Sequence, residues 1–201
     1  MSLLTELHAE IERCKNCELA RHRTRVVPGE GPEDARLLFI GEAPGHHEDQ
    51  TGRPFVGQAG QYLDQLIGMI GYKRNQVFIA NVIKCRPPEN RDPMPGEMMA
   101  CGKWLERQLE LIKPRVIVTL GRYSMSKYFP GDSISKVHGR SKRIGNVIYF
   151  AMYHPAAALH QGNLRRVIEA DILKLPAVLA EADKMEDEKD RPASSIFFKV
   201  S

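Results

Sequence analysis

Residues 37–45 read Leu37-Leu38-Phe39-Ile40-Gly41-Glu42-Ala43-Pro44-Gly45. A short apolar run of this kind is typical of a strand buried on both faces, and the glycine and proline after it predict that the chain turns into a loop there. Three further runs of the same type lie at residues 77–83, 116–120 and 147–151. The sequence therefore predicts four buried strands.

Helical patterns separate and follow these runs, at residues 60–70, 95–112, 124–129 and 164–179. Strands that alternate with helices indicate a parallel sheet with helices packed on its faces. We therefore expect an α/β fold with three layers, α/β/α, around a central, mostly parallel, four-stranded sheet.

The length of 201 residues favours one domain over two, because two halves of this chain would each bury little surface. We place this domain at residues 1–182. Residues 183–201 are rich in charge and predict a solvated tail. The tail contains Phe197 and Phe198, and these aromatic residues suggest an anchor for a partner such as a sliding clamp.

Charge and hydrophobicity indicate which partners and which cellular location the protein has. A formal charge of +4 favours a polyanionic partner, and the basic residues cluster at residues 13–25 and 136–143. No apolar run approaches the length of about 20 residues that a bilayer requires. We see no secretory signal at residues 1–6, so we expect a monomeric cytoplasmic protein without a membrane partner.

Four cysteines are present, Cys14, Cys17, Cys85 and Cys101. In a reducing compartment, metal ligation is a better explanation for them than disulfide bonds. Cys14 and Cys17 have the spacing of a metal-binding pair, and the other two could complete a tetrahedral set. The spacing leaves open whether they hold zinc, hold an iron–sulfur cluster or are buried free thiols.

Polar and glycine-rich loops follow all four predicted strands. Glu42 lies in the first loop, Asn81 near the end of the second strand, Gly121 after the third and His154 after the fourth. Because parallel strands end at a common edge of the sheet, these loops are expected to enclose one cleft. Each loop alone could be no more than a turn.

Several of these motifs, together with the four cysteines, resemble the family 4 uracil-DNA glycosylases over about residues 11–179. The motifs are residues 41–45 (Gly-Glu-Ala-Pro-Gly), 51–57 (Thr-Gly-Arg-Pro-Phe-Val-Gly), 81–88 (Asn-Val-Ile-Lys-Cys-Arg-Pro-Pro) and 154–157 (His-Pro-Ala-Ala). The resemblance implies the α/β fold of uracil glycosylases, uracil-containing DNA as the substrate, and a [4Fe–4S] cluster held by the cysteines.

For such a reaction a base must be flipped out of the duplex into a pocket. Phe55 is the candidate for stacking on the base, and Asn81 offers both a donor and an acceptor to the edge of uracil. His154 is the candidate donor to the oxygen O2, where negative charge develops. The resemblance aligns Phe55 and Asn81 with base-binding positions of the family.

Glu42 is the candidate carboxylate for orienting the attacking water. In the first family of uracil-DNA glycosylases an aspartate has this role, and Ala43 stands at the matching position here. The backbone carbonyl of Ala43 is therefore an alternative to Glu42. Glu48 and Asp49 are reserve carboxylates, although an exposed acidic turn is the expected structure for both. Gly45 completes the predicted substrate loop.

DNA contacts are predicted from small and basic residues. Glycines let backbone N–H groups approach phosphates, basic side chains attract the strand, and an apolar side chain fills the gap left by the flipped base. The residues assigned to these roles are Gly45, Gly57, Gly121, Arg86, Lys142, Arg143 and Leu159.

Two rival functions fit parts of the sequence. The first is a protein on the same scaffold that traps uracil-DNA covalently, as members with an inserted basic loop and a reactive histidine do. Residues 86–93 contain no histidine and no such insertion, so turnover is favoured. The second rival is a noncatalytic zinc module that binds nucleic acid.

Overall fold

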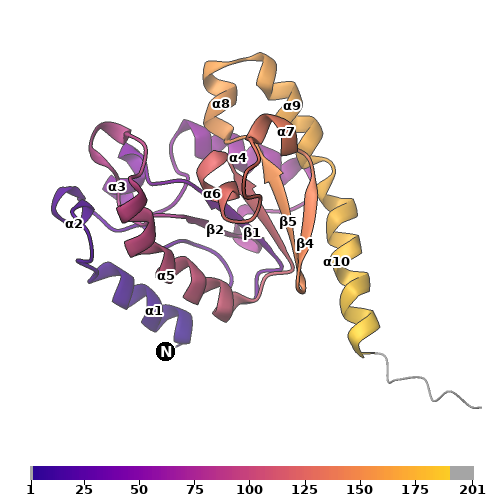
Figure 1. The fold of residues 1–201 in the computed structure, drawn as a ribbon, viewed down its shortest axis with the longest axis horizontal. Helices are drawn as coiled ribbons and strands as arrows, with labels where there is room; N and C mark the ends of the chain where they lie inside the picture. Colours follow the sequence, from indigo (N-terminus) through magenta and orange to yellow (C-terminus); the bar gives the residue numbers. More distant parts are fainter. Residues whose placement is uncertain (1, 191–201) are drawn as a thin grey trace, which may run out of the picture.

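The computed structural model describes residues 2–190, and within this range the sheet has five strands. Figure 1 shows the sheet at the centre of the molecule, with helices around it. The strands are β1 (Leu37–Gly41), β2 (Phe78–Asn81), β3 (Val116–Leu120), β4 (Ser141–Ile144) and β5 (Val147–Met152).

The strand order is β2-β1-β3-β5-β4, and β1, β2, β3 and β5 are mutually parallel. The predicted mostly parallel α/β sheet is confirmed, and its four predicted strands correspond to these four. The chain passes from β1 to β2 on one side and then to β3 on the other side of β1. Such a reversal opens a crevice at the carboxyl ends of the strands, where ligands bind in sheets of this kind.

The strand number of four was wrong, because β4 adds an antiparallel fifth strand at the edge. Its residues, Ser141 to Ile144, are all exposed and carry no apolar alternation that could reveal a strand. The hairpin to β5 is closed by Gly145 and Asn146, and Gly145 has the left-handed φ of +61° that a two-residue turn needs. Tertiary pairing with β5, not burial, makes this segment a strand.

The α-helices surround the sheet and agree with the predicted patterns in part. The helix predicted at 95–112 is α5. It begins with Pro95 at its first position, and the residue after its end, Lys113, caps it in a left-handed conformation. The pattern at 164–179 is divided between two helices. The helices are α1 (Leu3–Glu12), α2 (Leu19–His22), α3 (His46–Thr51), α4 (Gln58–Met69), α5 (Pro95–Ile112), α6 (Arg122–Ser126), α7 (Ile134–Val137), α8 (Pro155–His160), α9 (Asn163–Ile172) and α10 (Leu175–Asp190), with short 3₁₀ turns at Arg74–Gln76 and Pro88–Asn90.

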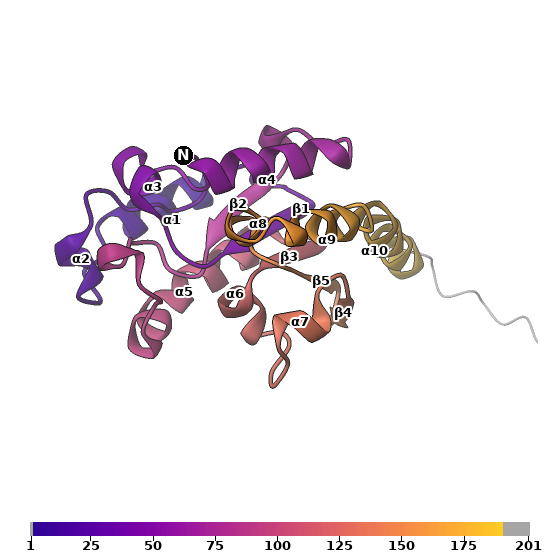
Figure 2. The same cartoon turned by 90° about the horizontal axis from the view of Figure 1, so that it is seen from above.

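Two apolar cores lie on the two faces of the sheet, which confirms the three-layer architecture. Successive residues of β1 alternate between them, as the period of two in a strand requires. Leu37 and Phe39 pack in the core formed with α4, α8, α9 and α10. Leu38 and Ile40 pack in the core formed with α1, α5 and α6. Figure 2 shows α8, α9 and α10 following one another along one side of the molecule.

The predicted domain boundary after residue 182 falls inside α10, which continues to Asp190. Asp183 is ion-paired with Arg36 and lies close to Arg115, so the beginning of the predicted tail contacts the domain. Residues 195–200, with the predicted sliding-clamp contact, lie outside the described residues. In the described part of the chain, no helix is long and apolar enough to span a bilayer.

Candidate active site

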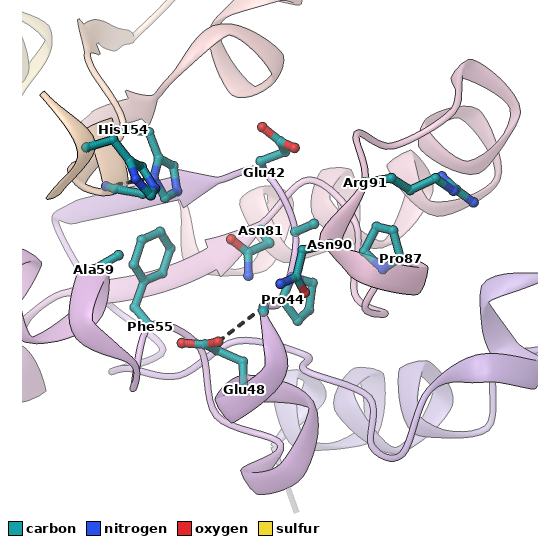
Figure 3. A pocket seen from close by; sticks show the side chains of 14 residues that line it. Glu42, Pro44, Glu48, Phe55, Ala59, Asn81, Pro87, Asn90, Arg91 and His154 are labelled. Carbon is teal, nitrogen blue, oxygen red and sulfur yellow. Dashed lines mark hydrogen bonds between the residues drawn. The ribbon is translucent and has the colours of Figure 1, made fainter. Parts of the chain in front are cut away.

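A cavity of about 410 Å³ lies at the carboxyl ends of β1, β2 and β5, and Figure 3 shows the side chains around it. The loops after these strands come together there, as expected for parallel strands that end at one edge. Six residues predicted from the sequence line this cavity: Glu42, Ala43, Gly45, Phe55, Asn81 and His154.

Phe55 and His154 form one wall of the cavity. Their ring centroids lie 5.5 Å apart and the ring planes differ by 28°, so the two rings are stacked. Phe55 has a left-handed φ of +50°, a conformation that a bulky residue adopts only when its surroundings impose it. With this backbone conformation, the ring of Phe55 lines the cavity.

Asn81 lies at the end of β2 with its side chain in the same cavity (Figure 3). Only 2% of the residue is exposed, yet its Oδ1 atom has no hydrogen-bond partner among the described residues. A buried polar atom without a partner costs about 1–3 kcal/mol. The amide is therefore ready to accept a hydrogen bond from a ligand that enters the cavity.

Gly41 allows Phe55 and Asn81 to approach each other. A Cβ atom at this position would lie 2.3 Å from Asn81 Oδ1 and 2.5 Å from Phe55 Cζ. These distances are shorter than real contacts, so any side chain here must displace the ring, the amide or both. From the sequence, Gly41 is expected in the loop after the first strand and in the motif at residues 41–45, with no contact to Phe55 or Asn81 predicted for it.

We predict that Gly41→Ala lowers the rate of the uracil release that the resemblance implies by about 10- to 100-fold, because the Phe55 ring and the Asn81 amide are both displaced. Gly68→Ala in α4 is a matched control, since its added Cβ would meet no heavy atom within 4 Å. The rates are compared in a single-turnover assay on uracil-containing DNA. Equal rates in the two variants would contradict the proposed contact geometry.

His154 has a defined tautomer because it caps α8. Its Nδ1 accepts the backbone N–H of Ala156 at 3.1 Å, so in the neutral ring the proton is on Nε2. Burial lowers the pKa of His154 to about 4, and the nearby Glu48 opposes this shift. At neutral pH the ring is therefore uncharged and has one N–H to donate.

Glu48 holds the loops of the cavity together. One carboxylate oxygen accepts the N–H groups of Val56 and Gly57 at 2.8 and 2.9 Å, and the other accepts that of Gly45 at 3.1 Å. A carboxylate with three such donors is an anchor for the backbone. The sequence suggested Glu48 only as a reserve carboxylate in an exposed turn, and its long-range partners could not be read from local sequence.

Asp49, the other reserve carboxylate, is also structural. It is 2% exposed and accepts the backbone N–H groups of Thr24 and Arg25. The expected exposed acidic turn is therefore wrong for Asp49. Its carboxylate ties α3 to the segment that precedes β1.

Glu42 is the carboxylate at the open side of the cavity. Burial raises its pKa to about 7, the negative charge of Asp92 adds to this effect, and Arg122 opposes it. Asp92 is itself paired with Arg122 at 2.5 Å. A carboxyl group with a pKa near neutrality exchanges protons readily at the pH of a cell.

The glycines predicted to approach phosphates already use their own N–H groups. Those of Gly45 and Gly57 donate to Glu48, and that of Gly121 donates to the carbonyl of Met152 at 2.8 Å. Phosphate contacts through these three N–H groups would need those bonds to break. Gly121 instead has a local role, because a Cβ atom there would lie 3.1 Å from the Cβ atom of His154.

The other predicted DNA contacts are spread over the surface. Arg86 is half-buried beside the cavity and donates to Asn90, which lines it. Leu159 is 43% exposed on α8, so it is not a core residue, and its neighbour His160 lines the cavity.

Lys142 and Arg143 lie on the edge strand β4, where they pair with Tyr149 and Ile148 in the first half of β5. They do not line the cavity, which the carboxyl ends of the strands enclose. Further lining residues that the sequence reading did not single out include Pro87, Asn90, Arg91 and His160.

The four cysteines line a second, smaller cavity between α1, α2 and α5. Three donors point at their sulfur atoms: Arg23 at Cys85 (3.1 Å), the N–H of Lys84 at Cys101 (3.3 Å) and the Trp104 indole at Cys14 (3.3 Å). Such hydrogen bonds stabilise thiolates and are typical around metal-bound sulfur.

Burial favours the protonated form of two of these thiols. Burial raises the pKa of Cys101 to about 11 and also raises that of Cys85, so the protein alone keeps both protonated. A metal centre deprotonates cysteine on binding. Among residues 2–190, no group of three or more His, Cys, Asp or Glu side chains is close enough together to hold a single metal ion.

The comparisons with known proteins agree with this geometry. The model of the uracil DNA glycosylase superfamily matches residues 28–173. The chain is 48% identical over 185 residues to the type-4 uracil-DNA glycosylase of Sulfurisphaera tokodaii, with 87% of this chain and 84% of that protein covered. The type-4 enzyme of Thermotoga maritima is 45% identical over 177 residues, covering 85% and 92%. A type-5 uracil-DNA glycosylase of Pyrobaculum aerophilum is 30% identical over 172 residues, covering 76% of each.

This chain thus belongs to the uracil DNA glycosylase superfamily, and its α/β fold agrees with that assignment. Within the superfamily it is a member of the type-4 uracil-DNA glycosylases. The resemblance drawn from the short motifs is confirmed.

Proposed function

We propose that this chain is a uracil-DNA glycosylase, which binds a uracil flipped out of DNA in the cavity and hydrolyses its N-glycosidic bond. Release of the base initiates base excision repair. The observation that carries the proposal is the buried Oδ1 of Asn81, which has no hydrogen-bond partner within residues 2–190. Uracil presents an N3–H donor and an O4 acceptor on one edge, and the Asn81 amide offers an acceptor and a donor to match them.

The proposed roles of the other groups follow from their geometry. Phe55 stacks on the base, and the neutral His154 donates its Nε2–H to O2. The bond between C1′ of the sugar and N1 of uracil breaks, and its electron pair leaves with the base as an anion. A hydrogen bond to O2 stabilises that developing charge.

Water completes the reaction at the sugar. The water oxygen bonds to C1′, and one water proton passes to the Glu42 carboxylate. The raised pKa of Glu42 suits this step, because a stronger base accepts the proton more readily. The carbonyl of Ala43 orients the same water in an alternative version of this step.

A uracil-release assay tests the function. The protein is incubated with DNA that contains one uracil and with the same DNA carrying thymine or cytosine, and free base is measured. We expect release of uracil alone and in multiple turnovers. A protein–DNA adduct that persists on a denaturing gel would instead favour covalent trapping, and no release at all would refute the proposal.

We also propose that Cys14, Cys17, Cys85 and Cys101 hold a [4Fe–4S] cluster. The four thiols around one cavity and the three N–H donors to sulfur support this assignment. When bound, the cluster would cross-link the segment between α1 and α2, helix α5 and the loop after β2. It thereby stabilises the N-terminal segment against the core.

We predict that protein purified without oxygen is brown and contains iron and acid-labile sulfide in equal amounts. Cys101→Ala is expected to lose iron and to melt at a lower temperature, because a ligand from α5 is removed. Metal analysis and thermal melting measure both effects. Zinc without iron in the wild-type protein would contradict the cluster and favour a zinc module.

Uracil-containing DNA is the partner in this proposal. The assigned DNA contacts of Gly57, Arg86, Gly121, Lys142, Arg143 and Leu159 remain predictions. The monomeric state, the cytoplasmic location and the sliding-clamp contact also remain predictions.

A further inference from the structure

Lys84 is the fully buried lysine in the loop after β2, with 1% of its surface exposed. Its Nζ donates to the backbone carbonyl of Asn81 at 2.9 Å and to Oε1 of Gln108 at 2.6 Å. Burying an amine is costly unless it is hydrogen-bonded, so an amine in this place needs both partners. The side chain of Lys84 folds back along its own loop to reach Asn81.

Gln108, which accepts the hydrogen bond from the Lys84 amine, is itself held in place by other groups. It lies on α5, is completely buried and donates from Nε2 to the carbonyl of Pro28 at 2.9 Å. The same nitrogen lies 3.1 Å from Nε2 of His8 on α1. The amine of Lys84 therefore has two partners from separate parts of the chain, and one of them, Gln108, is itself held by Pro28 and lies beside His8.

The backbone of Lys84 is anchored as well. Its N–H donates to Sγ of Cys101, and the next residue is Cys85. The segment 81–85 thus has the base-binding amide at one end and a cysteine of the second cavity at the other. Lys84 is hydrogen-bonded to Asn81 through its side chain and to Cys101, another cysteine of the second cavity, through its backbone N–H.

Lys84 contacts Asn81 through the main chain of Asn81 and not through its side chain. The Lys84 amine donates to the backbone carbonyl of Asn81, while the side-chain Oδ1 of Asn81 has no partner among the described residues. An amide that is positioned through its backbone keeps its side-chain groups available for a base. An apolar residue at position 84 could fill the same space without making this bond.

We infer that Lys84 is a positioning residue for uracil recognition: it holds the backbone of Asn81 so that the free amide meets the edge of the base. The inference rests on the proposed function and adds a residue that acts through Asn81 without touching the substrate. The amine also connects the base pocket to α1 and α5, the helices beside the cysteines.

Lys84→Met tests this role, because methionine keeps an apolar stem of similar length and removes the amine. We expect the single-turnover rate of uracil release to fall about 10- to 100-fold, since small misplacement of a binding group has effects of this size. In a double-mutant cycle, Lys84→Met is expected to cause little further loss when Asn81 is already alanine. A residue with a merely structural role would cause the same loss in both backgrounds.

Leu105→Ala is the matched control. Leu105 is buried on α5 in the same core and makes no hydrogen bond to Asn81 or Lys84. We expect this variant to melt at a lower temperature but to release uracil at the wild-type rate well below its melting temperature. Loss of activity equal to that of Lys84→Met would overturn the inference, as would loss of iron from Lys84→Met in proportion to its activity.

Two further measurements keep the inference testable. If Lys84→Met does not fold, Gln108→Leu replaces it in the cycle, and absence of coupling with Asn81 then counts against the role. Native-state hydrogen exchange of residues 78–85 needs no substrate, and we expect faster exchange in Lys84→Met than in Leu105→Ala. If the wild-type protein releases no uracil, the proposed function fails, whereas unchanged exchange or full additivity overturns only the role of Lys84.

Discussion

His154→Ala is expected to slow uracil release by about 10²–10³-fold, the loss typical of removing a donor to a developing negative charge. The structure gives the donor one orientation, because Nδ1 accepts the N–H of Ala156 and leaves the proton on Nε2. Alanine removes this N–H and also the ring that stacks on Phe55. Single-turnover kinetics on uracil-containing DNA measure the effect on the chemical step.

The control for this variant is His22→Ala, which removes an exposed histidine from α2. It is expected to have the wild-type rate. Retention of more than about a tenth of the wild-type rate in His154→Ala would contradict a transition-state contact, since a hydrogen bond to charge contributes more than that.

The lowered pKa of His154 gives the same variant a second signature. The folded protein keeps the ring neutral down to a pH of about 4, whereas the unfolded chain takes up a proton near the ordinary value of 6.5. The unfolded state therefore binds more protons in this window, and His154 makes the protein less stable as the pH falls from 6.5 to 4. Thermal melting across this range should show a shallower loss in His154→Ala than in the wild type.

Asn81→Asp is expected to reduce uracil release by at least about 100-fold, because a site built to hydrogen-bond its substrate strongly rejects a mismatch. The carboxylate lacks the N–H that meets O4 of uracil and places a second acceptor there. Cytosine carries an amino group at this position, which can donate to the carboxylate. We therefore expect release of cytosine to become detectable.

Parallel assays on DNA containing uracil or cytosine measure both effects. Asn163→Asp makes the same chemical change at an exposed position in α9 and is expected to alter neither activity. Wild-type uracil release by Asn81→Asp would show that Asn81 does not read the base. A thermal melt of both variants separates this effect from simple unfolding.

Much of the fold and several groups of the site could be predicted because they depend on local sequence. Apolar runs such as residues 37–40 define the strands, and the residues after each strand lie at the common edge of a parallel sheet. This rule alone predicts that Glu42, Asn81 and His154 surround one cavity, and all three line it. The fifth strand escaped prediction because its four residues are exposed and gain their structure from pairing with β5.

By itself, then, the sequence determined the four central strands, the family and the residue types that face the pocket, since short-range patterns carry that information. Tertiary structure alone decided which polar groups are already bonded and which are free. Glu48 reaches loops on either side of α3, Lys84 is bonded to α5, and Asn81 keeps an oxygen that has no partner in the described part of the chain. Each depends on the distance between residues far apart in the chain, which only the packing of the sheet and its helices sets.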